Sequence, residues 1–127
     1  MPPVHSETVP GDGVALAVHR WGGGDGAPVL LAHPTGFHGV AWEPVARRLA
    51  ARGYRVWSFD FRGHGDSARS PNGYHWHGFA RDVGAVTRHL GIDHDPALLA
   101  AGHSKGGAAL LLDEAEHPGT YARLWCY

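Results

Sequence analysis

The chain has 127 residues, 43% of them hydrophobic and 18% charged, a composition that predicts a globular domain and excludes a disordered segment. The formal net charge of -1 excludes the basic excess that binds nucleic acid or anionic membranes, and a single cysteine excludes an internal disulfide framework. The N-terminus has no signal-peptide pattern, and no apolar run approaches the ~20 residues of a membrane span. We therefore expect residues 1–127 to form one soluble, cytoplasmic domain.

The N-terminal stretch predicts a β-hairpin over residues 8–21. A Pro-Gly-Asp-Gly turn at 10–13 precedes an alternation of larger and smaller residues from Val14 to His19, which is the two-residue period of a half-buried strand. The glycine-rich loop at 22–26 is not a predicted phosphate site, because a phosphate-binding loop needs a helix after it and usually a lysine, and neither follows.

The rest of the chain alternates short apolar strands with amphipathic helices, whose apolar residues recur three and four positions apart. In chain order we expect a strand at 28–33, a helix from near 44 to 53, a strand at 55–61, a helix at 76–90, a strand, turn and helix at 98–112, and a strand at 122–127. This order predicts an α/β fold, with a mostly parallel sheet and helices on both faces. Such sheets carry their sites at the carboxyl ends of the strands.

The third strand-to-helix turn contains the G-x-S-x-G pattern, as Gly102-His103-Ser104-Lys105-Gly106. A serine on so sharp a turn adopts a strained backbone, and the strand and helix around it pass so closely that only small residues fit two positions away. Gly102 and Gly106 meet that need. The turn exposes the Ser104 hydroxyl near free N–H groups at a helix N-terminus, which makes Ser104 a candidate nucleophile.

Three motifs in this order resemble those of the α/β-hydrolase family. Residues 31–37, Leu-Ala-His-Pro-Thr-Gly-Phe, are similar to the oxyanion loop after the family's third strand. Residues 58–67, Ser-Phe-Asp-Phe-Arg-Gly-His-Gly-Asp-Ser, look like its D-x-R-G-x-G-x-S segment, and the turn at Ser104 is the third motif. The resemblance covers nearly the whole chain, but only the N-terminal half of a usual member, and it implies the N-terminal part of an α/β-hydrolase fold.

The resemblance implies a serine hydrolase that cleaves an ester, lactone or similar acyl bond of a small molecule, without a cofactor. Its oxyanion would be held by the backbone N–H groups of Thr35 and Lys105. Pro34 stands where the family commonly has glycine, and Thr35 is chosen as the donor for its place two residues after His33. A nucleophilic aspartate, as in dehalogenase-like relatives, is disfavoured because position 104 is serine.

Several other polar side chains near these motifs have ordinary structural interpretations. The candidates for lining a substrate pocket are His33, Phe37 and His103. We expect His33 to hold its loop by hydrogen bonds, Asp60 and His64 to tie the loop that follows them, and the Lys105 side chain to be a solvated surface charge. No metal site is expected among the 11 histidines, because no ligand pattern such as H-E-x-x-H occurs.

The family places its catalytic acid and histidine after later strands, and no position of this chain matches either one. We therefore expect residues 1–127 to be nearly inactive alone. The alternative is a truncated or degenerate, non-catalytic protein with the same fold. A nucleotide-binding domain would need G-x-G-x-x-G after its first parallel strand, where residues 33–36 read His-Pro-Thr-Gly. We also expect self-association through an exposed edge of the C-terminal strand.

Overall fold

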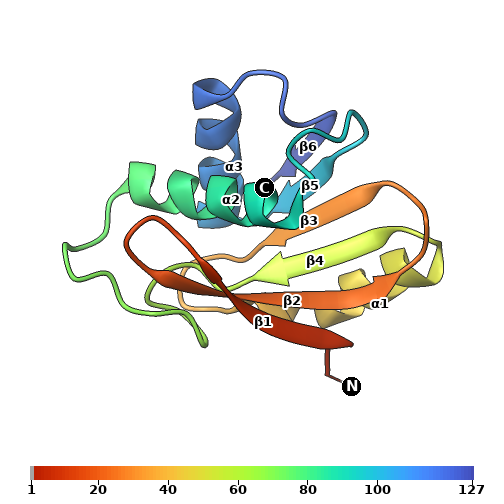
Figure 1. The fold of residues 1–127 in the computed structure, drawn as a ribbon, viewed down its shortest axis with the longest axis horizontal. Coiled ribbons are helices and arrows are strands. Elements are labelled where there is room, and N and C mark those ends of the chain that lie inside the picture. The colour runs from red at the N-terminus through yellow and green to blue at the C-terminus, as the bar shows by residue number, and fades with distance from the viewer. Residues whose placement is uncertain (1) are drawn as a thin grey trace.

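The computed structural model describes residues 2–127 and contains one six-stranded sheet. In chain order the elements are β1 (His5–Pro10), β2 (Ala15–Gly23), β3 (Pro28–Ala32), the 3-10 helix η1 (Gly39–Trp42), α1 (Glu43–Ala51), β4 (Arg55–Phe59), α2 (Trp76–Leu90), β5 (Leu99–Gly102), α3 (Lys105–Glu116) and β6 (Arg123–Cys126). The strand order is β1-β2-β4-β3-β5-β6 (Figure 1). The first two pairings are antiparallel and the other three are parallel, which confirms the predicted hairpin and mostly parallel sheet.

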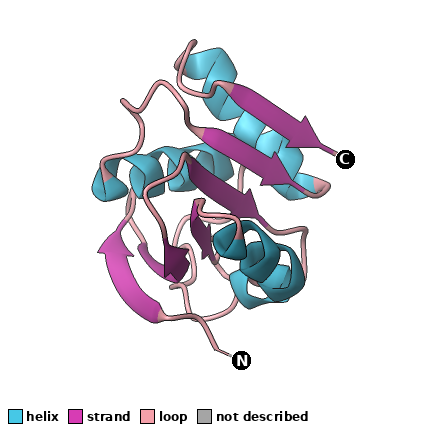
Figure 2. Ribbon diagram, turned by 90° about the vertical axis from the view of Figure 1, so that its right-hand side faces the viewer, coloured by secondary structure: helices cyan, strands magenta, loops and turns pink. Residues whose placement is uncertain are grey.

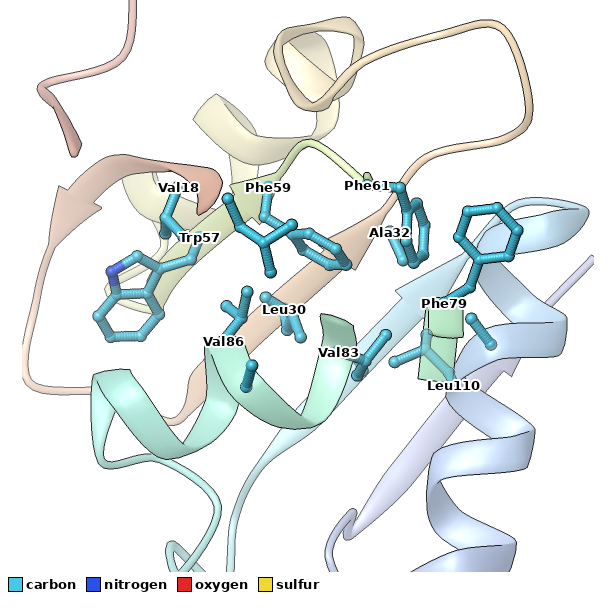
Figure 3. Packing of buried hydrophobic residues seen from close by; sticks show 14 of the residues in the cluster. Val18, Leu30, Ala32, Trp57, Phe59, Phe61, Phe79, Val83, Val86 and Leu110 are labelled. Carbon is cyan, nitrogen blue, oxygen red and sulfur yellow. The ribbon is translucent and has the colours of Figure 1, made fainter. Parts of the chain in front are cut away.

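Helices cover both faces of the sheet, as expected. The helices α2 and α3 pack against each other on one face, and α1 packs against β2 and β4 on the other (Figure 1). Successive residues of a strand point to opposite faces, so the neighbours Leu30 and Leu31 of β3 enter different cores. Both leucines are fully buried. Removing a leucine side chain from water stabilises the fold by about 1.5–3 kcal/mol. The larger core joins Leu30 with Phe59, Phe61 and Val83 (Figure 3).

The half-buried pattern expected for the second strand is wrong. Residues Leu16 to His19 of β2 are all buried, including Ala17 and His19, which the alternating pattern placed on the solvent-facing side. The reason is the position of β2 inside the sheet, between β1 and β4, with α1 packed on one side and α2 on the other. His19 tolerates this burial because its Nε2–H donates to Asp60 and its Nδ1 accepts from the hydroxyl of Ser6.

The helix ends follow the glycines of the sequence. Gly91, at φ 70°, ends α2 in the left-handed conformation, and its N–H donates to the carbonyl of Arg88. Gly53 follows α1 with φ 93°. The strand predicted at 55–61 is shorter, because β4 ends at Phe59 and the N–H of Phe61 donates to His33 Nε2 instead of to a neighbouring strand.

The C-terminal strand β6 lies at the edge of the sheet and pairs only with β5 (Figure 2). Trp125 and Tyr127 are 51% and 68% exposed at this edge. Among residues 2–127, no helix combines the length and the apolar character that crossing a membrane requires.

Candidate active site

The turn between β5 and α3 has the strained geometry expected of a nucleophile elbow. Ser104 has φ 53° and ψ −113°, and it is the one non-glycine residue with positive φ among residues 2–127. Such a conformation costs about 1–3 kcal/mol and persists only where the surrounding structure imposes it. The N–H of Ser104 donates to the carbonyl of Tyr127, and the side chain is exposed at the N-terminus of α3. The fold therefore presents this hydroxyl to an incoming molecule.

The two glycines of the motif lie where the chain crosses itself most tightly. A Cβ atom on Gly102 would come within 3.0 Å of backbone atoms of Gly106 and Gly107. A Cβ atom on Gly106 would come equally close to the backbone of Ala32 and His33, at the end of β3. These are backbone contacts and cannot be relieved by a side-chain rotation. The requirement for small residues is confirmed, and it extends to the approach of α3 to β3.

The loop after β3 brings the second proposed oxyanion donor to the same end of the sheet. The N–H of His103 donates to the carbonyl of Ala32, which joins the end of β3 to the elbow. Thr35 is exposed in the turn that follows, which is closed by a bond from the Phe37 N–H to the Pro34 carbonyl. Within residues 2–127, neither the Thr35 nor the Lys105 N–H donates to a protein acceptor. Both donors are thus available for a ligand.

Asp60 fastens this loop to the rest of the sheet. Its Oδ1 accepts from the Gly39 N–H at 2.6 Å and from His19 Nε2 at 3.2 Å, and its Oδ2 accepts from the Asp66 N–H at 2.9 Å. Burial opposes ionisation of the carboxyl, but these three donors outweigh it and hold the pKa of Asp60 below its usual value. The structural role expected for Asp60 is confirmed, and its reach to Gly39 and His19 was not foreseen.

His33 has no free nitrogen for catalysis. Its Nδ1–H donates to the Pro34 carbonyl at 2.7 Å, and its Nε2 accepts from the Phe61 N–H at 3.0 Å. Burial, together with the nearby charge of Lys105, lowers the pKa of His33 to about 4. The expectation that His33 holds its loop is confirmed. A place for His33 in the lining of a substrate pocket stays a prediction; its side chain is fully buried and is not among the lining residues of the two pockets beside the elbow.

Two pockets flank the elbow. One, of about 240 Å³, is lined by Phe37 and His103, as expected, together with Trp42 and Tyr127. The His103 ring lies against that of Tyr127, with centroids 5.2 Å apart. The other pocket, of about 430 Å³, is bordered by Thr35 and Lys105 and by three aromatic residues in the first turn of α2 and just before it. These are Tyr74, Trp76 and Phe79.

The Lys105 side chain is not the solvated surface charge that we expected. Lys105 is 5% exposed, and its Nζ lies 4.7 Å from the centroid of the Phe61 ring and 4.2 Å from that of Phe79. Burial lowers the pKa of Lys105 to about 8. The reason is the long-range packing of α2 on α3, which closes the aromatic rings over the first turn of α3.

An ion pair that the sequence did not single out holds the loop after β4 against α2. The guanidinium of Arg62 donates from Nε and Nη2 to both oxygens of Asp82, and the Arg62 N–H donates to the same carboxylate. Both residues are buried. The D-x-R-G-x-G-x-S motif was the available signal, since a charged residue inside a buried loop needs a buried partner.

No side chain of residues 2–127 is hydrogen-bonded to the Ser104 hydroxyl. A Ser–His–Asp series does occur elsewhere, through Ser6, His19 and Asp60. It borders none of the pockets, however, and it serves to join β1, β2 and the end of β4. The described part of the chain also holds no cluster of three metal-ligating side chains.

Comparisons with known proteins agree with this geometry. Residues 25–126 match the family model for serine aminopeptidase, S33. The chain is 34% identical over 106 residues to a non-heme haloperoxidase of Rhodococcus erythropolis, covering 84% of this chain and 37% of that protein. It is 30% identical over 107 residues to a bifunctional esterase/perhydrolase of Acinetobacter calcoaceticus, covering 84% and 38%.

Solved structures give the same result. A thioesterase domain from the curacin biosynthetic pathway superposes with a TM-score of 0.86 at 29% identity, over 96% of this chain and 45% of that one. The chain thus spans 37–45% of the length of these relatives. The six-stranded sheet, the strained serine turn and the family match lead to one conclusion: the chain belongs to the α/β-hydrolase family.

Proposed function

We propose that Ser104 is the nucleophile of a serine hydrolase that cleaves an ester, lactone or similar acyl bond. The observation that carries this proposal is the strained, exposed Ser104 at the N-terminus of α3. A protein retains a strained backbone of this kind where the conformation serves its function. The esterase/perhydrolase and thioesterase relatives support acyl chemistry on this fold.

The reaction has two steps. The Ser104 oxygen attacks the carbonyl carbon, the carbonyl oxygen becomes an oxyanion, and the Thr35 and Lys105 N–H groups donate to it. The bond to the leaving group then breaks, and the proton from Ser104 passes through a general base to the departing alcohol. In the second step water attacks the acyl–Ser104 ester, releases the acid and restores the hydroxyl. Each oxyanion donor is worth about 3–4 kcal/mol of transition-state stabilisation.

The general base for Ser104 would come from outside the described residues. His33 and His64 have both ring nitrogens engaged, and the exposed His103 makes no hydrogen bond to Ser104. We therefore propose that residues 1–127 supply the nucleophile and the oxyanion donors. The acid and the histidine would then come from a segment corresponding to the part of the longer relatives that this chain does not span.

A fluorophosphonate probe tests the assignment, because it phosphonylates activated serines. The probe is applied to the chain extended by a segment carrying an acid and a histidine. We expect labelling of the peptide containing Ser104, and we expect Ser104→Ala to abolish it. The matched control is Ser6→Ala, which removes the serine of the other Ser–His–Asp series and leaves labelling unchanged. Labelling that persists in Ser104→Ala would refute the proposal and favour the non-catalytic alternative.

A further inference from the structure

The buried ammonium of Lys105 has no carboxylate partner. Among residues 2–127, no Asp or Glu oxygen forms a salt bridge with its Nζ, although Lys105 is only 5% exposed. The nearby carboxylate of Asp82 is occupied by the guanidinium and the N–H of Arg62. The charge of Asp82 favours the ammonium, but the cost of burying the ammonium is the larger effect. The rings of Phe61 and Phe79 offset only part of that cost.

Within residues 2–127, the hydrogen-bond partner of this ammonium is the imidazole of His64. His64 Nδ1 lies 3.0 Å from the Arg62 carbonyl, and a carbonyl only accepts, so Nδ1 carries the ring proton. The Nε2 lone pair is then left to accept from Lys105 Nζ, at 3.3 Å. An ammonium has three N–H donors. One is used by His64, and within residues 2–127 the other two have no hydrogen-bond acceptor.

Lys105 borders the larger of the two pockets beside the elbow. The pocket, of about 430 Å³, is lined by two nitrogen-bearing side chains, Lys105 and His64, and by the aromatic residues Tyr74, Trp76 and Phe79. Tyr74 and Trp76 are 47% and 56% exposed, so the aromatic side is open to an entering molecule. Thr35, a proposed oxyanion donor, lines the same pocket. The pocket therefore adjoins both residues proposed as oxyanion donors, Thr35 and Lys105.

We infer that this pocket binds the carboxylate of an organic acid with an aromatic or apolar body, and that Lys105 is the residue that selects it. A monoanion matches the single unpaired charge, whereas phosphate dianions are usually met by arginine clusters or by several backbone donors. One consequence for the substrate rests on the proposed function. If Ser104 accepts an acyl group, the acyl part of the preferred substrate carries a second, free carboxylate.

Paired ligands test the site without requiring turnover. Phenylacetate and phenylacetamide have nearly the same shape, but only the first is charged at neutral pH. Binding of each to the 127-residue chain is measured by calorimetry and by quenching of tryptophan fluorescence at pH 7. We expect phenylacetate to bind at least ~10-fold more tightly, and we expect added salt to reduce the difference. Equal affinities in the wild-type chain would overturn the inference.

Three variants separate the possible explanations. Lys105→Met keeps the apolar stem without the charge and is expected to abolish the preference for phenylacetate. Arg69→Met removes an exposed charge that does not line the pocket, so the preference is retained. Ser104→Ala also retains it, which keeps failure of the proposed acyl transfer distinguishable from failure of the anion site. A preference that survives in a folded Lys105→Met variant would overturn the assignment of Lys105.

Discussion

Replacing Asp60 by asparagine should destabilise the chain by about 3 kcal/mol at pH 7. The amide keeps an oxygen for the Gly39 and His19 donors, but its nitrogen then faces the Asp66 N–H, and two donors cannot pair. Loss of one bond to a charged group costs about 1.5–3 kcal/mol. The two remaining hydrogen bonds then have an uncharged acceptor, and each weakens by up to about 1 kcal/mol. Asp66→Asn, an exposed change in the same loop, should shift stability by less than about 0.5 kcal/mol.

The pH dependence gives this prediction a second readout. The pKa of Asp60 in the folded chain lies below the usual value of 3.8. Its stabilising contribution is therefore complete well above pH 3.8 and is lost as the pH falls through the folded-state pKa. Asparagine does not titrate, so the stability difference between wild type and Asp60→Asn should shrink below pH 3.8.

Urea unfolding followed by tryptophan fluorescence measures both effects, at pH 7 and at pH 3. If Asp60→Asn unfolds within about 0.5 kcal/mol of the wild type at pH 7, or no more easily than Asp66→Asn, the reasoning about the three donors is wrong.

Three further predictions concern Lys105, the sheet edge and catalysis. Lys105→Met should stabilise the chain at pH 7 by at most about 3 kcal/mol, because the pKa of Lys105 in the folded chain, about 8, lies below the ordinary 10.5. Urea unfolding should show the stability difference between the variant and the wild type shrinking as the pH rises from 8 to 10.5. Equal stability at pH 7 would contradict the cost assigned to burying the ammonium. The exposed edge of β6, with Trp125 and Tyr127, should give dimers or aggregates on size-exclusion chromatography, whereas a monodisperse monomer would show that the edge is protected. Turnover of 4-nitrophenyl acetate by residues 1–127 alone should match that of Ser104→Ala, because a serine hydroxyl without a base is a weak nucleophile; robust turnover removed by Ser104→Ala would mean that His33, His64 or His103 acts as the base.

The features that the sequence predicted depend on local patterns. Continuous apolar runs indicated the buried strands, three- and four-residue spacing indicated α2, and Gly91 marked its end. The strained turn followed from Gly102 and Gly106 around Ser104, since a side chain at either position would collide with neighbouring backbone. These choices concern a few neighbouring residues, so the sequence alone determines them.

The features that were missed depend on residues far apart in the chain. Lys105 is buried because Phe61 and Phe79, more than 25 positions earlier, close over it, and nothing in the sequence around Lys105 indicates that contact. The burial of Ala17 and His19 depends on the place of β2 inside the sheet. Asp60 was expected to tie its own loop, but its bonds to His19 and Gly39 required the assembled sheet.

The central claim is that Ser104 carries the acyl group. It is tested most directly by peptide mass mapping after a brief exposure to 4-nitrophenyl acetate of the chain extended by a segment with an acid and a histidine. We predict a burst of 4-nitrophenol of about one equivalent and an acetyl group on the peptide containing Ser104. An acetyl group found on Ser6, on a lysine or on no residue, with turnover unchanged in Ser104→Ala, would contradict the claim.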